Sequence, residues 1–209
     1  FDHIDVIKGA SALKFGSDAV GGVIVLEPSI LPKKDTLEGA IRLSGISNGQ
    51  GFATDINLSK TWKNGWGIRT NGGYKKLGDL SAPDYGLQNT GLESSSFSFG
   101  VQNISFLQGI SFDYYGTNQV IGILRSSHVS SADDLANALS QEEPLFQRDF
   151  TYDIDNPKQD VQHHIAKISA FKRFENLGKI SATYSFQYNH RKEFDIRRGE
   201  ELSKIPALD

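Results

Sequence analysis

The strongest constraint on the fold is a two-residue alternation of apolar and polar side chains that recurs from residue 37 to the end of this 209-residue sequence. In residues 180–188, the apolar members are Ile180, Ala182, Tyr184, Phe186 and Tyr188. Successive side chains of a β-strand point to opposite faces, so this segment predicts a strand with one apolar and one polar face. Seven such strands are predicted, at about residues 38–47, 52–62, 66–75, 94–105, 110–124, 161–174 and 179–194. The chain is therefore predicted to be all-β.

The joints between these predicted strands differ in length. Short joints lie at residues 48–51, 64–65, 107–109 and 175–178, and long joints lie at 76–93 and 125–160. After the first joint, short and long joints alternate, which places tight turns at one edge of the sheet and long loops at the other. This asymmetry is typical of outer-membrane β-barrels. In a barrel the polar face would line the lumen, and Arg69, Gln187 and Asn189 would belong to it.

A secreted or periplasmic β-sandwich, acting as a binding or adhesion module, is the alternative that also predicts alternation. The strand lengths favour the barrel, because sandwich strands mostly have 5 to 6 residues and a tilted membrane strand needs about 9 to 11. Seven strands do not close a bacterial barrel, which uses an even number of at least eight. Because Phe1 stands where a start methionine would, we expect the chain to be a fragment of a larger barrel protein.

Composition excludes several other classes of protein. The longest apolar stretch, residues 19–26, is far shorter than the roughly 18 residues of a membrane-spanning helix. A net charge of −3 gives no general attraction to nucleic acid, so no nucleic-acid partner is expected. The absence of cysteine excludes disulfide scaffolds, zinc–thiolate sites and thiol catalysis.

No pattern in the sequence predicts an enzyme or a cofactor site. The segment from Gly9 to Gly16 lacks the spacing and the lysine of a phosphate-binding loop, and no serine elbow of a hydrolase is present. His163 and His164 are adjacent on a predicted strand, so they point to opposite faces and do not chelate one metal ion, although either could touch a substrate. The acidic loop 125–160 is expected to be a solvated surface with a short helix at 132–141, capped by Ser131.

Residues 4–24 resemble the end of the plug domain of TonB-dependent outer-membrane receptors. The family pattern reads roughly I-E-V-[IL]-[RK]-G-P-x-S-x-L-Y-G-x-x-A-x-G-G-V-I. The residues that match in order and spacing include Gly9, Leu13, Phe15, Gly16, Ala19, Gly21, Gly22, Val23 and Ile24. Lys8 stands where many members have arginine, and Ala10 replaces the usual proline. Residues 149–155 and 171–179 resemble, more weakly, the first third of the barrel in Bacteroidetes-like receptors.

This resemblance implies a plugged, 22-stranded barrel in the cell outer membrane, with residues 1–35 closing the plug domain and residues 36–209 opening the barrel. It implies energy-dependent uptake of a scarce bulky nutrient, such as an iron–siderophore, haem or cobalamin. A TonB-type inner-membrane complex would be the partner that supplies the energy, and outer-membrane lipid would surround the barrel. The resemblance implies no catalytic role and no resident cofactor.

Overall fold

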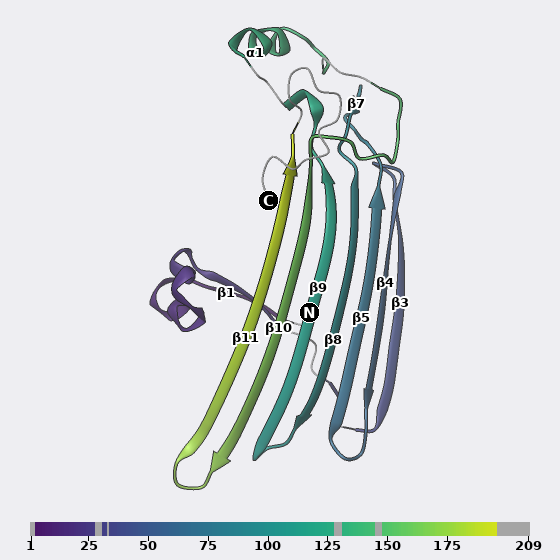
Figure 1. The fold of residues 1–209 in the computed structure, drawn as a ribbon. Helices are drawn as coiled ribbons and strands as arrows, with labels where there is room; N and C mark the ends of the chain where they lie inside the picture. The colour runs from purple at the N-terminus through teal and green to yellow at the C-terminus, as the bar shows by residue number, and fades with distance from the viewer. Residues whose placement is uncertain (1–2, 28–30, 33, 128–130, 145–147, 196–209) are drawn as a thin grey trace.

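The computed structural model describes residues 3–27, 31–32, 34–127, 131–144 and 148–195. Its main feature is a single seven-stranded antiparallel sheet with strand order β11-β10-β9-β8-β5-β4-β3 (Figure 1). The strands are β3 (Thr36–Ile46), β4 (Gly51–Thr61), β5 (Trp66–Leu77), β8 (Leu92–Ile104), β9 (Gln108–Gly122), β10 (Lys158–Phe174) and β11 (Gly178–Phe194). Each long strand therefore pairs with the long strand that follows it in the chain. The predicted all-β class and all seven predicted strands are confirmed.

The strand register carries the two-residue alternation across the whole sheet. One row of directly paired residues consists of Ile41, Ile56, Gly72, Phe97, Gly116, His164 and Tyr188. Directly paired residues of antiparallel strands point to the same side, so this row belongs to one face. We call this apolar side the outer face and the opposite, polar side the inner face.

The two ends of the sheet differ in their connections, as predicted. The tight turns 62–65, 105–107 and 175–177 all lie at one end, which we call the tight-turn end (Figure 1). Gly65 at φ 84° and Gly178 at φ 76° adopt the left-handed conformation that these turns require. The opposite end carries the turn 47–50 and the longer segments 78–91 and 123–157.

The segments outside the sheet are short. A hairpin of β1 (His3–Ile7) and β2 (Val23–Glu27) encloses two 3₁₀ segments, η1 (Gly9–Phe15) and η2 (Ser17–Gly21). In the longer connections lie β6 (Leu80–Ser81), β7 (Gly86–Leu87), η3 (Arg125–Ser127) and α1 (Ala132–Leu139). Helix α1 begins where predicted, with the Leu135 amide donating to the Ser131 carbonyl, and ends two residues before the predicted 141. None of the helices in the described ranges is long and apolar enough to cross a membrane.

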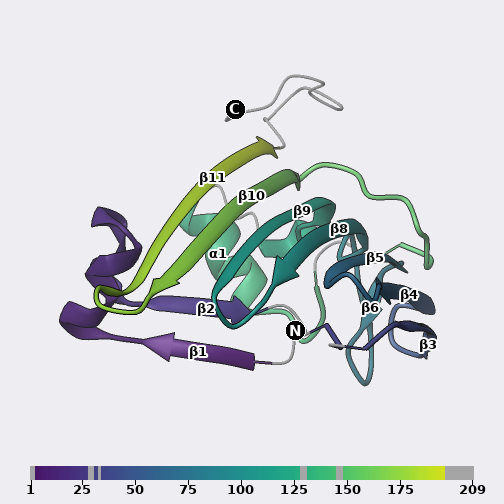
Figure 2. The same cartoon turned by 90° about the horizontal axis from the view of Figure 1, so that it is seen from below.

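The seven strands form an arc, and the hairpin β1–β2 lies on its open side (Figure 2). Little of the outer face is covered. The buried apolar side chains are Ala12, Ala19, Leu31 and Leu77, whereas Ile41, Leu43 and Tyr184 are about 70% exposed. Strand β2 was expected to be buried, but Ile24 is 69% exposed because no described element packs over that side of the hairpin. The predicted exit of the plug at 28–35 includes 28–30 and 33, and the predicted barrel part includes 196–209; these residues lie outside the described ranges.

Candidate functional site

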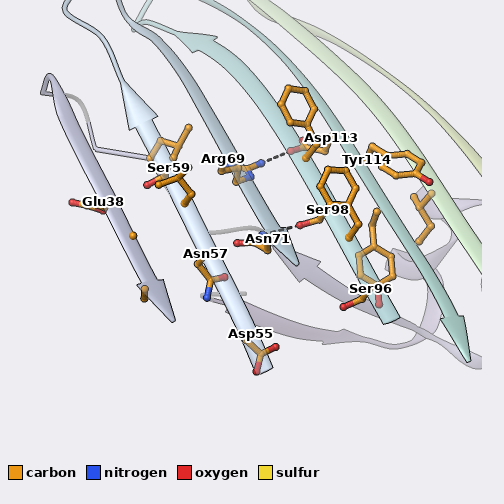
Figure 3. Close-up of a pocket in the computed structure, with 18 of the residues that line it drawn as sticks. Glu38, Asp55, Asn57, Ser59, Arg69, Asn71, Ser96, Ser98, Asp113 and Tyr114 are labelled. Atoms are coloured by element: carbon orange, nitrogen blue, oxygen red, sulfur yellow. Dashed lines mark hydrogen bonds and ion pairs between the residues drawn. The ribbon is translucent and has the colours of Figure 1, made fainter. Parts of the chain in front are cut away.

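The inner face of the sheet lines a groove of about 910 Å³, which is the candidate site (Figure 3). The register aligns its polar side chains in rows that cross neighbouring strands. One row consists of Glu38, Ser59, Arg69, Gly100, Asp113 and Lys167. The next row consists of Ala40, Asn57, Asn71, Ser98, Tyr115 and Ile165. The site is therefore a continuous polar surface built from six strands.

An ion pair crosses one strand within this groove. Arg69 on β5 donates through Nη2 to Oδ1 of Asp113 on β9, and β8 lies between them. The pair spans β8 at Gly100, where an added Cβ would lie 2.8 Å from both Arg69 Nε and Asp113 Oδ1. The two side chains are only 12% and 22% exposed. Glycine at position 100 therefore makes room for a partly buried charge pair.

The same arrangement recurs one row higher. Gly73 on β5 lies between Asp55 on β4 and Ser96 on β8. A Cβ at Gly73 would lie 2.8 Å from Ser96 Oγ and 3.2 Å from Asp55 Oδ1. Between these two rows, Asn71 Nδ2 donates to Ser98 Oγ at 2.7 Å. The groove floor is thus held by side-chain contacts between strands that are not always direct neighbours.

The groove has balanced charge. The charged residues that line it are Arg42, Arg69, Lys167, Glu38, Asp55 and Asp113, and their formal charges cancel. Such a surface offers both donors and acceptors to a polar ligand or protein segment, without a net field for a polyanion. Among the described residues, no group of three or more His, Cys, Asp or Glu side chains is placed to hold a metal ion.

Four of the five site residues predicted on the sheet share the inner face. Arg69 and His163 line the groove. Asn189 pairs directly with His163, and Gln187 pairs with the groove residue Ile165, so both lie on the same face. They are exposed on β11, the strand at one edge of the sheet.

His164, the fifth of these residues, lies on the outer face. Its Nδ1 is 2.8 Å from the Tyr114 hydroxyl, and its ring is 6.1 Å from both the Tyr114 and the Tyr188 rings. The predicted separation of His163 and His164 onto opposite faces is therefore present. His164 contributes to an aromatic row on the outer face and does not face the groove.

The predicted plug motif forms a compact loop between β1 and β2. Lys8 precedes η1 in an extended conformation, and Gly9 and Gly16 flank that segment at φ 71° and 125°. Gly22, at φ 112°, follows η2, and a Cβ there would lie 3.0 Å from the Ile7 carbonyl oxygen. Gly21 has open space around its Cβ position. Gly9, Gly16 and Gly22 thus adopt conformations that other residues rarely adopt.

Sequence reasoning missed an ordered network above the groove, at the end opposite the tight turns. We call residues 47–50, 78–91 and 148–157 the rim. Arg148 joins two of its segments, with Nε donating to Asp79 Oδ2 at 3.2 Å and Nη1 donating to Asp155 Oδ2 at 2.7 Å. Burial acts to lower the pKa of Arg148, but hydrogen bonds to Asp79 and Asp155 outweigh it and raise the pKa, so the guanidinium stays charged.

Asn89 is the second centre of the rim. Its side chain donates to the Ile123 and Pro157 carbonyls at 3.0 and 2.8 Å and accepts from the Asp155 amide at 2.8 Å. The residue is 2% exposed and has φ 58°, a left-handed conformation that asparagine tolerates.

The turn 47–50 joins the same network. The Gly78 amide donates to the Gly49 carbonyl at 2.8 Å, and Tyr152 donates to the Gln50 carbonyl at 2.7 Å. Segments that are far apart in the sequence therefore form one structure at the mouth of the groove. The partners are too distant in the sequence for any periodic pattern to reveal them, and the left-handed Asn89 is the kind of local signal that could have pointed to an ordered loop.

Comparison with known proteins adds no name to this geometry. No protein-family model matches the sequence, and no curated protein matches it.

Proposed function

We propose that this chain is part of a TonB-dependent receptor, a plugged β-barrel of the bacterial outer membrane that takes up a scarce bulky nutrient. An iron–siderophore, haem or cobalamin would be the cargo, and a TonB-type inner-membrane complex would supply the energy. The plug-like motif at residues 4–24 supports this proposal from the sequence. The distribution of apolar side chains on the outer face supports it from the structure.

The outer face is apolar over only part of its height, and this observation carries the proposal. On β10 the outer-face residues between His164 and Phe174 include Ala166, Ile168 and Ala170. Toward the rim, the same face of β10 carries Gln162, Asp160 and Lys158 instead. Residues 164–174 rise about 33 Å along the strand at ~3.3 Å per residue, or about 25 Å when the strand is tilted by ~40°. That is the height of the apolar band of an outer-membrane barrel.

Aromatic side chains border this band at both levels. Near its upper limit, ring centroids lie 6.4 Å apart for Phe97 and Tyr114, and 6.1 Å apart for His164 and Tyr188. Near the tight turns, Trp66 and Phe174 are 43% and 39% exposed on the outer face. Aromatic girdles at the two interfaces are typical of membrane barrels, because the rings are stable between lipid tails and water.

The open edges of the sheet argue for further strands. Among the described residues, β3 and β11 each pair with one neighbour only. A strand of 17 residues such as β11, with an unpaired edge and an exposed apolar face, favours aggregation unless another strand pairs with it. Closure into a barrel would pair both edges. The β-sandwich alternative would need a second sheet on the outer face, and the described long strands all belong to one sheet.

In this proposal the plug fills the space beside the inner face. The hairpin β1–β2 already lies on that side of the arc (Figure 2). The balanced charges of the groove would contact the plug or the passing cargo, and the rim would form part of the outer mouth. Movement of the plug, driven by the TonB-type complex, would open the passage.

The proposal is tested in the organism that encodes the chain. Disruption of its reading frame should lower uptake of one cargo among labelled ferric siderophores, haem and cobalamin. A protonophore should lower uptake by the intact strain to the same level, because the energy comes from the inner membrane. The protein should fractionate with the outer membrane. Unchanged uptake of all three cargo classes, together with recovery in a soluble fraction, would contradict the proposal.

A further inference from the structure

We propose that the tight-turn end of the outer face binds an anionic phospholipid, with an acyl chain in a groove beside Ala170 and the headgroup phosphate at Lys172. This inference rests on the proposed membrane location and adds a specific lipid site to it. Phospholipid is the occupant because the site combines an apolar channel with a cation at one end, as the following observations show.

The channel is a groove of about 570 Å³ on the outer face. Its apolar lining consists of Trp66, Ile110, Ala170, Phe174, Ile180 and Ala182. Ala170 pairs directly with both Ile110 and Ala182, so two small side chains lie beside larger ones in one row. The small residues lower the surface between Ile110 and Ile180 and leave a hollow that suits a hydrocarbon chain.

The polar groups of the groove lie toward the tight turns. Lys172 lines the groove and pairs with Ile180, and its Nζ lies 5.4 Å from the centroid of the Phe174 ring. An ammonium group held over an aromatic face keeps hydrogen atoms free to donate to a phosphate. Asn103 and Gln108, which also line the groove, offer amide donors nearby. Cation, aromatic ring and apolar channel thus follow the order of a lipid headgroup and its tail.

The charge of this end favours an anionic headgroup over a zwitterionic one. Residues 62–66, 105–108 and 172–180 contain the bases Lys63, Lys172, Arg173 and Lys179, and the acid Glu175. Arg173 and Lys179 also lie over aromatic rings, 4.9 Å from Phe106 and 4.6 Å from Phe171. The rim has the opposite balance, with the acids Asp79, Asp84, Asp149, Asp153 and Asp155, and the base Arg148. Anionic lipid is therefore attracted to one end of the sheet.

The test measures lipid retention by the full chain in a neutral detergent. Phosphatidylglycerol and phosphatidylcholine with the same acyl chains are added, and bound lipids are counted by native mass spectrometry. The wild-type chain should retain phosphatidylglycerol preferentially. Lys172→Gln should lower that preference about fivefold, the effect of one basic residue near an anionic surface. Ala170→Trp, which fills the channel, should lower retention of both lipids.

Lys158→Gln is the matched control. Lys158 lies at the other end of the same strand and face, and its Nζ is 5.5 Å from the Phe194 ring. It should keep the wild-type lipid preference, since it lies outside the groove. An equal loss in both lysine variants, or in neither, would overturn the site. Displacement of phosphatidylglycerol by millimolar inorganic phosphate would also overturn it, because the site would then be a simple anion site.

A flotation assay with vesicles of the two lipids separates this inference from the proposed function. A wild-type chain that floats with both kinds of vesicle but retains the two lipids equally would overturn the lipid site alone. A chain that does not float with either would contradict the membrane location, and the lipid site with it. Circular dichroism of each variant confirms that the sheet is intact.

Discussion

Single residues decide whether polar groups can meet across the sheet. Arg69 reaches Asp113 over an intervening strand because Gly100 has no side chain at the crossing point. Gly72 is a glycine of the neighbouring strand with open space around its Cβ position. The two glycines therefore differ in what an added methyl group would meet, although both lie in central strands.

We predict that Gly100→Ala lowers the free energy of unfolding by about 1–3 kcal/mol, the usual cost of forcing a methyl group into a packed site. The added Cβ would have to displace either the guanidinium or the carboxylate. Gly72→Ala should change stability by no more than about 0.5 kcal/mol. Urea unfolding of the two variants in detergent measures the difference. Equal stabilities would show that the ion pair does not depend on the space at Gly100.

At the scale of elements, the rim joins three segments through a few buried polar groups. Asp79 is 5% exposed, and Arg148 supplies a charged partner to its carboxylate. A buried carboxylate without its partner is costly, so the contact holds segment 78–91 against segment 148–157.

We predict that Arg148→Met loosens the rim and leaves the strands intact. Loss of a hydrogen bond to a charged group, at ~1.5–3 kcal/mol, should speed amide exchange in residues 79–91 by roughly tenfold or more. Exchange in the centre of β8 should stay unchanged. Lys63→Met, at the tight-turn end, is the matched control and should have no effect on the rim. Unchanged exchange in the Arg148 variant would mean that the remaining rim contacts are sufficient.

The predicted strands were found because alternation is a local signal that every strand repeats. Their ends were less accurate: β10 begins at Lys158, whereas the prediction began at 161, because residues 158–160 continue the pairing without apolar alternation. The opposite faces of His163 and His164 followed from the period of a strand. The contact of Arg148 with Asp79 joins residues 69 positions apart, so no local pattern could predict it.

At the scale of the whole molecule, the sheet has one face for lipid and one for water. Ile168 lies in the middle of the apolar band on β10, and Ser169 is the next residue on the opposite face. We predict that Ile168→Lys lowers the stability of the inserted protein by about 2–4 kcal/mol, the cost of a lysine at the centre of a bilayer. Ser169→Lys should be tolerated, because it faces the polar side. Equal membrane insertion of both variants in vesicles would contradict the assignment of the faces.

The absence of cysteine allows the most direct test of the central claim, that the sheet spans the outer membrane with the rim outside. Asp84→Cys places one thiol in the segment 78–91, and Asn176→Cys places one in a tight turn; both positions are exposed. A membrane-impermeant maleimide added to intact cells should label Asp84→Cys alone, and both variants should be labelled after lysis. Labelling of both variants in intact cells, or of Asn176→Cys alone, would contradict this orientation and the receptor proposed from it.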